Sequence, residues 1–148
     1  MQVLSNQASS VAFYTIPDNL ESNAMNENTS SLTLGTIRNH YGSICENLEN
    51  LNELKLPPHP SKSKDNFDVY QNYEICAENR DELKEFLNDR NIGTLVQWGG
   101  KGIHHFEQLG FNQKLPNTDN FFKKCIMLPM NIFISDEDVR YVCQTIQT

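Results

Sequence analysis

The chain has 148 residues, a length that suits one domain with a single hydrophobic core. Its formal charge of −7 argues against nucleic acid or an anionic membrane surface as a partner, because such partners bind clustered Lys and Arg. No stretch approaches the ~20 apolar residues of a membrane span, and residues 1–10 lack the basic start and apolar run of an export signal. We therefore expect a cytoplasmic protein.

The first third of the chain is polar and shows little periodicity. Residues 11–16 are compatible with a short strand, and residues 23–34 give a weak helical pattern. Apolar residues then recur at spacings of three and four over residues 37–51, which predicts an amphipathic helix. We expect residues 1–36 to be poorly ordered and residues 37–148 to form the folded domain.

The middle of the chain alternates loop, strand and helix patterns. Prolines at the start of residues 57–66 end regular structure, so this stretch is expected to be a loop. Nearly alternating apolar residues over residues 67–77 predict a strand. Asn79, with Glu82 three residues later, is a helix-start signature. The β-branched and apolar residues 94–98 then predict a buried strand.

The last third continues the alternation of helices and strands. Apolar residues spaced three apart predict a short helix over residues 101–109, closed by Gly110 because glycine tolerates positive φ. Residues 118–124 predict another helix and residues 126–130 a short apolar strand, and Ser135 opens the last helix as a capping residue. The predicted fold is α/β, a two-layer sandwich in which helices cover one face of a small sheet.

Four cysteines are widely spaced and include no CxxC pair: Cys45, Cys76, Cys125 and Cys143. Each lies among apolar residues of a predicted helix or strand. This placement predicts buried, reduced thiols rather than disulfides or a zinc site.

A glycine-rich turn, Trp98-Gly99-Gly100-Lys101-Gly102, follows a predicted strand and precedes a predicted helix. Backbone N–H groups and a Lys at such a place can hold an anion. A Walker motif needs a longer glycine frame and a Ser or Thr after the Lys, where this chain has Gly102. Anion binding by Lys101 and an ordinary glycine turn therefore both stay open, as do ligand stacking and burial at the sheet rim for Trp98.

Two adjacent histidines, His104 and His105, lie in the predicted helix after this turn. Neighbouring positions on a regular helix diverge by about 100°, so the two imidazoles are not expected to ligate one metal ion. No Cys or carboxylate stands at ligand spacing from them. We therefore predict no metal site, and we expect the acidic run 136–138 to stabilise the first turn of a helix rather than to bind a cation.

Several local strings, together with the order of the elements from about Arg38 onward, carry a family resemblance. The strings are Arg80-Asp81-Glu82-Leu83, Asn91-Ile92-Gly93-Thr94, Gln108-Leu109-Gly110-Phe111, Met127-Leu128-Pro129-Met130 and Ser135-Asp136-Glu137-Asp138-Val139. They resemble the C-terminal part of the DegT/DnrJ/StrS family of sugar aminotransferases. The resemblance implies a pyridoxal-phosphate-dependent enzyme of the aspartate-aminotransferase fold type, which installs amino groups on nucleotide-linked keto-sugars.

The resemblance also implies roles for individual residues. Residues 24–27 resemble a family string whose preceding Asn reaches the cofactor phosphate of the partner subunit, and Ser22 takes that position, or Asn23 if the alignment shifts by one. The family places the loop after the strand equivalent to residues 94–98 near the sugar-nucleotide entrance, which implies that Gln97, Trp98 and Lys101 are substrate-side residues. The usual His-Tyr-Pro-like string is absent from this loop, so the substrate is not carried over.

The resemblance finally implies that the catalytic residues belong to another domain. In the family, a large domain carries the Schiff-base Lys, the Asp facing the pyridine nitrogen and most phosphate contacts, and none has a counterpart in this sequence. Residues 1–36 are then expected to be a remnant of the large-domain boundary and residues 37–148 the small domain. We expect this chain alone neither to bind pyridoxal phosphate nor to transaminate.

The expected partners follow from that division. The chain is expected to form a homodimer or to associate with a separate large-domain chain, as a truncated gene product or one piece of a split enzyme acting on a nucleotide sugar. The alternative is a non-catalytic interaction module that binds a full-length aminotransferase.

Overall fold

The structure, a computed structural model, describes residues 27–62 and 69–148, so the strand expected at residues 11–16 lies outside the described residues. The elements are α1 (Glu27–Leu48), β1 (Leu54–Lys55), β2 (Tyr73–Ala77), α2 (Arg80–Asn88), η1 (Gln97–Gly100), η2 (Ile103–His105), η3 (Glu107–Leu109), α3 (Pro116–Lys124), β3 (Cys125–Leu128) and α4 (Asp136–Ile146). The three η elements are short 3-10 helices. Within the described residues, no helix is long and apolar enough to cross a bilayer.

The sheet has three antiparallel strands in the order β1-β2-β3. Tyr73 lies opposite Leu128, and Ile75 lies opposite Ile126. These four side chains share one face of the sheet, because alternate side chains of a strand point to the same face and directly paired residues point the same way. All four are almost completely buried, so this face is the floor of the hydrophobic core.

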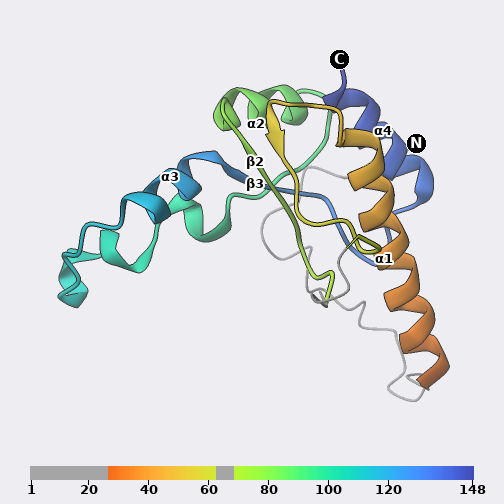
Figure 1. The fold of residues 1–148 in the computed structure, drawn as a ribbon, viewed down its shortest axis with the longest axis horizontal. Helices are drawn as coiled ribbons and strands as arrows, with labels where there is room; N and C mark the ends of the chain where they lie inside the picture. Colours follow the sequence, from red (N-terminus) through yellow and green to blue (C-terminus); the bar gives the residue numbers. More distant parts are fainter. Residues whose placement is uncertain (1–26, 63–68) are drawn as a thin grey trace.

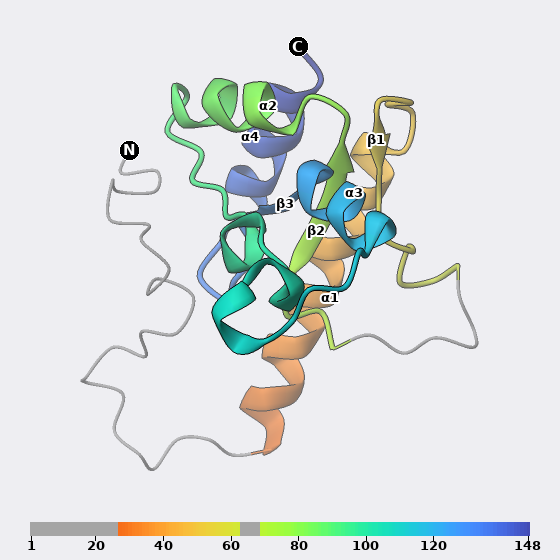
Figure 2. The same cartoon turned by 90° about the vertical axis from the view of Figure 1, so that its left-hand side faces the viewer.

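Helices α1, α2 and α4 pack over that face, and α3 lies on the other side of the sheet (Figures 1 and 2). The buried contacts come mainly from three helical stripes: Tyr41, Ile44 and Leu48 of α1, Leu87 of α2, and Val139, Val142 and Cys143 of α4. The predicted class, an α/β sandwich of a small sheet and a layer of helices, is confirmed.

Polar contacts fix α1 within this core. The Tyr73 hydroxyl on β2 donates to Cys45 Sγ on α1 at 3.1 Å, so a buried O–H has a partner. The buried His40 on α1 lies with its Nε2 2.9 Å from Oδ1 of Asp136, at the start of α4. The acidic first turn of α4 therefore also holds α1.

Helix α1 is longer than expected. It runs for 22 residues, and so joins most of the weak pattern at 23–34 to the predicted helix at 37–51. No proline interrupts these residues, so the backbone hydrogen bonds of a helix can continue through them. Strand β1 was not predicted, because two residues are too few to show a period.

The two best-marked helices, α2 and α4, lie where the sequence predicts them. Ser135 Oγ accepts from the Asp138 N–H at 3.1 Å, and Asp138 Oδ2 accepts from the Ser135 N–H at 3.0 Å, which is a complete capping box. Asn79 precedes α2 as expected, but its side chain makes no capping hydrogen bond. The start of α2 was thus predicted correctly, while the expected capping contact is absent.

Two predicted elements between α2 and α3 are wrong. Residues 94–98 do not form a strand, since Leu95 alone pairs, as an isolated bridge to Met127. The chain then turns away from the sheet edge because Trp98, Gly99 and Gly100 all take left-handed φ values of 54°, 61° and 73°. Residues 101–109 form two 3-10 helices instead of one regular helix. Gly110, with φ 80°, ends the second as predicted.

Replacing Ile126 by Ala should lower the free energy of unfolding by about 2–5 kcal/mol, because it opens a cavity in the floor of the core. Urea denaturation followed by far-UV circular dichroism measures this change. Ile132→Ala is the matched control, since Ile132 is 49% exposed and its loss should change the free energy by no more than about 0.5 kcal/mol. Equal effects of the two substitutions would contradict the assigned core.

Candidate functional site

The segment between α2 and α3 contains the residues that the sequence marks for chemistry. We call residues 97–115 the arm, and it extends away from helices α1 and α4 (Figure 1). Its root is fixed by the bridge between Leu95 and Met127, whose two N–H···O bonds measure 3.2 and 2.7 Å. On the α3 side, Arg80 Nη1 donates to the carbonyls of Phe122 and Cys125 at 3.3 and 3.2 Å. The sheet thus holds the chain just before the arm, and Arg80 of α2 holds the junction of α3 and β3 that follows it.

The glycine-rich turn stands at the beginning of the arm. Trp98 is 76% exposed, which excludes the buried position at the sheet rim for this ring. A left-handed backbone costs a non-glycine residue roughly 1–2 kcal/mol, so this turn presents the indole to solvent at some cost in stability. Strain of this kind is typical of binding sites rather than of passive loops.

The three predicted substrate-side residues lie together in this turn. Gln97 is half-buried, whereas Trp98 and Lys101 are exposed. Among the residues that the structure describes, the Lys101 ammonium has no hydrogen-bonding or ionic partner. An exposed aromatic ring beside a free cation and an amide can bind a ligand that has both a flat face and a negative charge.

The arm also exposes large apolar side chains. Ile103, Phe106 and Leu109, whose spacing predicts the buried stripe of a helix, are all exposed. They do not form one stripe, because Phe106, with φ −102° and ψ 78°, interrupts the helix between two short 3-10 turns. Groups of exposed apolar residues mark surfaces that another molecule or domain covers.

A compact cluster of His104, His105 and Asp119 joins the arm to α3. The Nε2 atoms of His104 and His105 lie 2.6 and 2.9 Å from the same carboxylate oxygen, Oδ1 of Asp119. The two imidazole centroids are 4.0 Å apart. The hydrogen bond to His104, and then the one to His105, holds the pKa of the Asp119 carboxyl below its usual range. We call these three residues the His–Asp cluster.

Sequence reasoning did not find this cluster, for two reasons. Adjacent side chains diverge on any helix, but here the Gly102 N–H donates to His105 Nδ1 at 3.0 Å, and the two imidazole rings come together against one carboxylate. The third member, Asp119, is far along the chain and could be noticed only as an acidic residue in the first turn of α3. Its contact with the histidines depends on the path of the arm.

Gly102 is required by this packing. A Cβ atom at position 102 would lie 2.7 and 2.8 Å from ring atoms of His104, and 3.2 Å from the Phe122 ring. His104 is buried and held by Asp119, so its ring cannot simply rotate away. The glycine therefore permits the close approach of backbone and imidazole.

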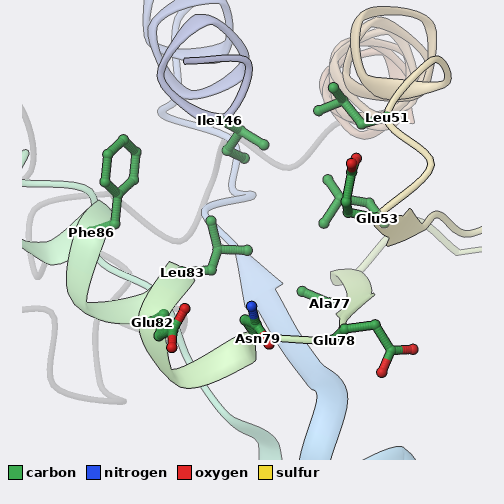
Figure 3. A pocket seen from close by; sticks show the side chains of 10 residues that line it. Leu51, Glu53, Ala77, Glu78, Asn79, Glu82, Leu83, Phe86 and Ile146 are labelled. Atoms are coloured by element: carbon green, nitrogen blue, oxygen red, sulfur yellow. The ribbon is translucent and has the colours of Figure 1, made fainter.

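A separate groove of ≈ 430 Å³ lies between the ends of α1, α2 and α4 (Figure 3). Its apolar surface comes from side chains such as Leu83, Phe86 and Ile146, and the carboxylates of Glu53 and Glu82 line it as well. These carboxylates repel the phosphates of a nucleotide, and the groove contains no residue of the arm. The groove is therefore not a candidate site for an anionic substrate.

The lysines of the described residues bear on whether this part of the chain could hold pyridoxal phosphate. A Schiff-base lysine needs a desolvated or cationic environment that lowers its pKa. Here the lysines are exposed or paired with carboxylates, and the bond to Glu49, at 2.7 Å, raises the pKa of Lys62 instead. Ser22 and Asn23, the expected contacts to the cofactor phosphate, lie outside the described residues. We assign no chemical step to the cofactor on this part of the chain.

Comparison with known proteins decides the family. A profile of the DegT/DnrJ/EryC1/StrS aminotransferase family matches residues 35–147. The chain belongs to this family. A relative described as a pleiotropic regulatory protein from Geobacillus stearothermophilus is 31% identical over 91 residues, which make up 59% of this chain and 24% of the relative.

Solved structures of longer proteins contain the fold of this chain. The aminotransferase TlmJ from Streptoalloteichus hindustanus matches with a TM-score of 0.67 and 20% identity, over 81% of this chain and 33% of that one. DesV from S. venezuelae matches with a TM-score of 0.68 and 20% identity, over 76% and 30% of the two chains. These neighbours are fold-type I aminotransferases, and this sequence spans about a third of their length or less.

Substituting Gly102 by Ala should displace His104 and lower the free energy of unfolding by about 1–3 kcal/mol, as overpacking does elsewhere. The pKa of Asp119 should rise toward its usual value as the bond to His104 is lost. Chemical denaturation and an NMR titration of the carboxyl carbon measure the two effects. Gly35→Ala is the control, because its Cβ would meet nothing within 4 Å on an exposed part of α1. If Gly102→Ala leaves the pKa of Asp119 unchanged, the assigned packing is wrong.

Proposed function

We propose that this chain supplies the small domain of a pyridoxal-phosphate-dependent nucleotide-sugar aminotransferase. The observation that carries the proposal is the family match over residues 35–147, which includes the whole arm. Residues 1–36 then form the boundary toward the large domain. The reaction would serve the synthesis of amino sugars, including those of surface polysaccharides, in the cytoplasm.

The large domain would supply the catalytic chemistry. The Schiff-base Lys and the acid that faces the pyridine nitrogen belong to that domain, which is encoded outside this sequence, either in the same polypeptide or in a separate chain. Ser22 or Asn23 would reach the cofactor phosphate across a dimer interface. The exposed and ion-paired lysines of the described residues support this division, because none lies in an environment suited to a Schiff base.

The arm would form the rim of the substrate pocket. The free ammonium of Lys101 can pair with the diphosphate of a nucleotide sugar, and the exposed ring of Trp98 can stack on a base or a sugar face. Gln97, half-buried between them and the sheet, can donate to a sugar hydroxyl. The apolar residues of the arm would be covered when the large domain closes over the site.

A second candidate function uses the same surface without chemistry. The exposed Ile103, Phe106 and Leu109 would let the chain act as an interaction module that binds a full-length aminotransferase. The two functions differ in one respect: the arm contacts substrate in the first and contacts only protein in the second.

A hybrid enzyme separates them. Residues 35–147 would replace the matching part of a family aminotransferase, and the hybrid should retain cofactor absorbance and transaminate a nucleotide keto-sugar. Trp98→Ala in the hybrid should raise KM for the nucleotide sugar by roughly two- to tenfold, because a stacking contact of ~0.5–1.5 kcal/mol is lost. Steady-state kinetics measure this change.

Phe133→Ala in the same hybrid is the control, since this ring is exposed but lies outside the arm and should leave KM unchanged. An active hybrid whose KM does not respond to Trp98→Ala would refute the substrate role of the arm. A hybrid that folds and binds cofactor but does not transaminate would favour the interaction module.

A further inference from the structure

The His–Asp cluster brings together the ligands of a metal ion. Among the described residues, His104, His105 and Asp119 each offer one ligand atom, and these three atoms all lie within 4.8 Å of one another. We propose that this cluster binds a divalent transition-metal ion of the zinc class, through Nε2 of each histidine and a carboxylate oxygen of Asp119. The proposal does not depend on the proposed function.

The ligand set has the chemistry of an open zinc site. Two neutral imidazoles and one carboxylate give a net charge of −1, which favours a divalent cation. Three protein ligands with a fourth position left to water are typical of such sites, and imidazole also suits nickel and copper. The side chain of His104 is 5% exposed, while those of His105 and Asp119 are more open, so one ligand is fixed and the ion has a path to it.

The present distances require only a small expansion. The two Nε2 atoms lie 2.6 and 2.9 Å from Asp119 Oδ1, which are hydrogen-bond distances. Ligands placed tetrahedrally about zinc at ~2.0–2.1 Å are separated by roughly 3.3 Å, so the cluster must open by about half an ångström. The exposed side chains of His105 and Asp119 can make this adjustment without disturbing the core.

Metal binding must also change which ring nitrogen of His104 and His105 carries the proton. Nδ1 of His105 accepts a hydrogen bond from the Gly102 N–H, and Nδ1 of His104 is buried without a partner. In the metal-free state, both neutral rings therefore carry the proton on Nε2 and donate it to Asp119. An ion on Nε2 moves each proton to Nδ1. The bond from Gly102 is then lost, and the site is weaker than one whose second ring nitrogens have acceptors. This switch provides a specific signature of binding.

Two other histidine–carboxylate pairs serve as internal references. His40 with Asp136, at 2.9 Å, and His59 with Glu46, at 3.3 Å, each offer only two ligands. The cysteines are poor competitors in the folded chain, because burial raises the pKa of the Cys125 and Cys143 thiols to about 11. A metal response should therefore be confined to the His–Asp cluster.

Titration of the full chain with zinc ion near neutral pH, under reducing conditions, should show one binding event per chain by calorimetry. Nitrogen-15 NMR of the histidine rings should show His104 and His105, but not His40 or His59, passing from the Nε2–H to the Nδ1–H form. Asp119→Asn and His105→Gln should each weaken zinc binding by more than about tenfold. Both residues are partly exposed, and circular dichroism would verify that the variants fold.

His59→Gln is the matched control, because it removes an imidazole from a two-ligand pair and should leave zinc affinity unchanged. Absence of a stoichiometric binding event would overturn the proposal and leave the cluster as a hydrogen-bonded clasp. Binding that is unchanged by Asp119→Asn and His105→Gln would overturn it equally, since the ion would then be held elsewhere.

Discussion

The pairing of β2 with β3 is the constraint on which the rest of the molecule depends. Its register places Tyr73 and Ile75 beside Leu128 and Ile126, which makes one continuous apolar face. Helices α1, α2 and α4 bury their apolar side chains on this face, and all of these side chains belong to one core cluster. On its outer edge, β3 pairs through Met127 with the residue at the root of the arm, so the same strand positions both the core and the candidate site.

The arm contrasts with that core in both composition and shape. Its turn uses left-handed residues to leave the sheet, and its apolar side chains are exposed rather than packed. These features fit the role that we propose for the arm. A surface that closes over a pocket must be apolar enough to exclude water, and it binds more tightly when its shape is already set.

The elements that could be predicted from sequence are those whose signals are local. The last helix is marked by Ser135 and Asp138, three residues apart, and its capping contacts form as expected. Residues 94–98 have the composition of a strand, but the backbone angles of Gly99 and Gly100 end the pairing after one residue, and composition does not encode that choice. The fold class followed from the alternation of patterns, which tolerates such local errors.

In the candidate site, too, local features could be predicted from sequence and non-local contacts could not. Gln97, Trp98 and Lys101 are close in sequence and lie in or next to one turn, although Gln97 was expected in a strand. The contact of His104 and His105 with Asp119 is not local. It depends on the close packing of Gly102 against His104 and on the return of the chain through α3, neither of which has a short sequence signature.

We propose that this chain shapes a pocket and leaves the covalent chemistry to another domain. Incubating the full chain with pyridoxal phosphate, reducing with borohydride and mapping lysine adducts by mass spectrometry tests it most directly. We expect no near-visible aldimine band and only scattered, substoichiometric labelling of exposed lysines. One lysine modified in stoichiometric yield, together with such a band, would contradict it.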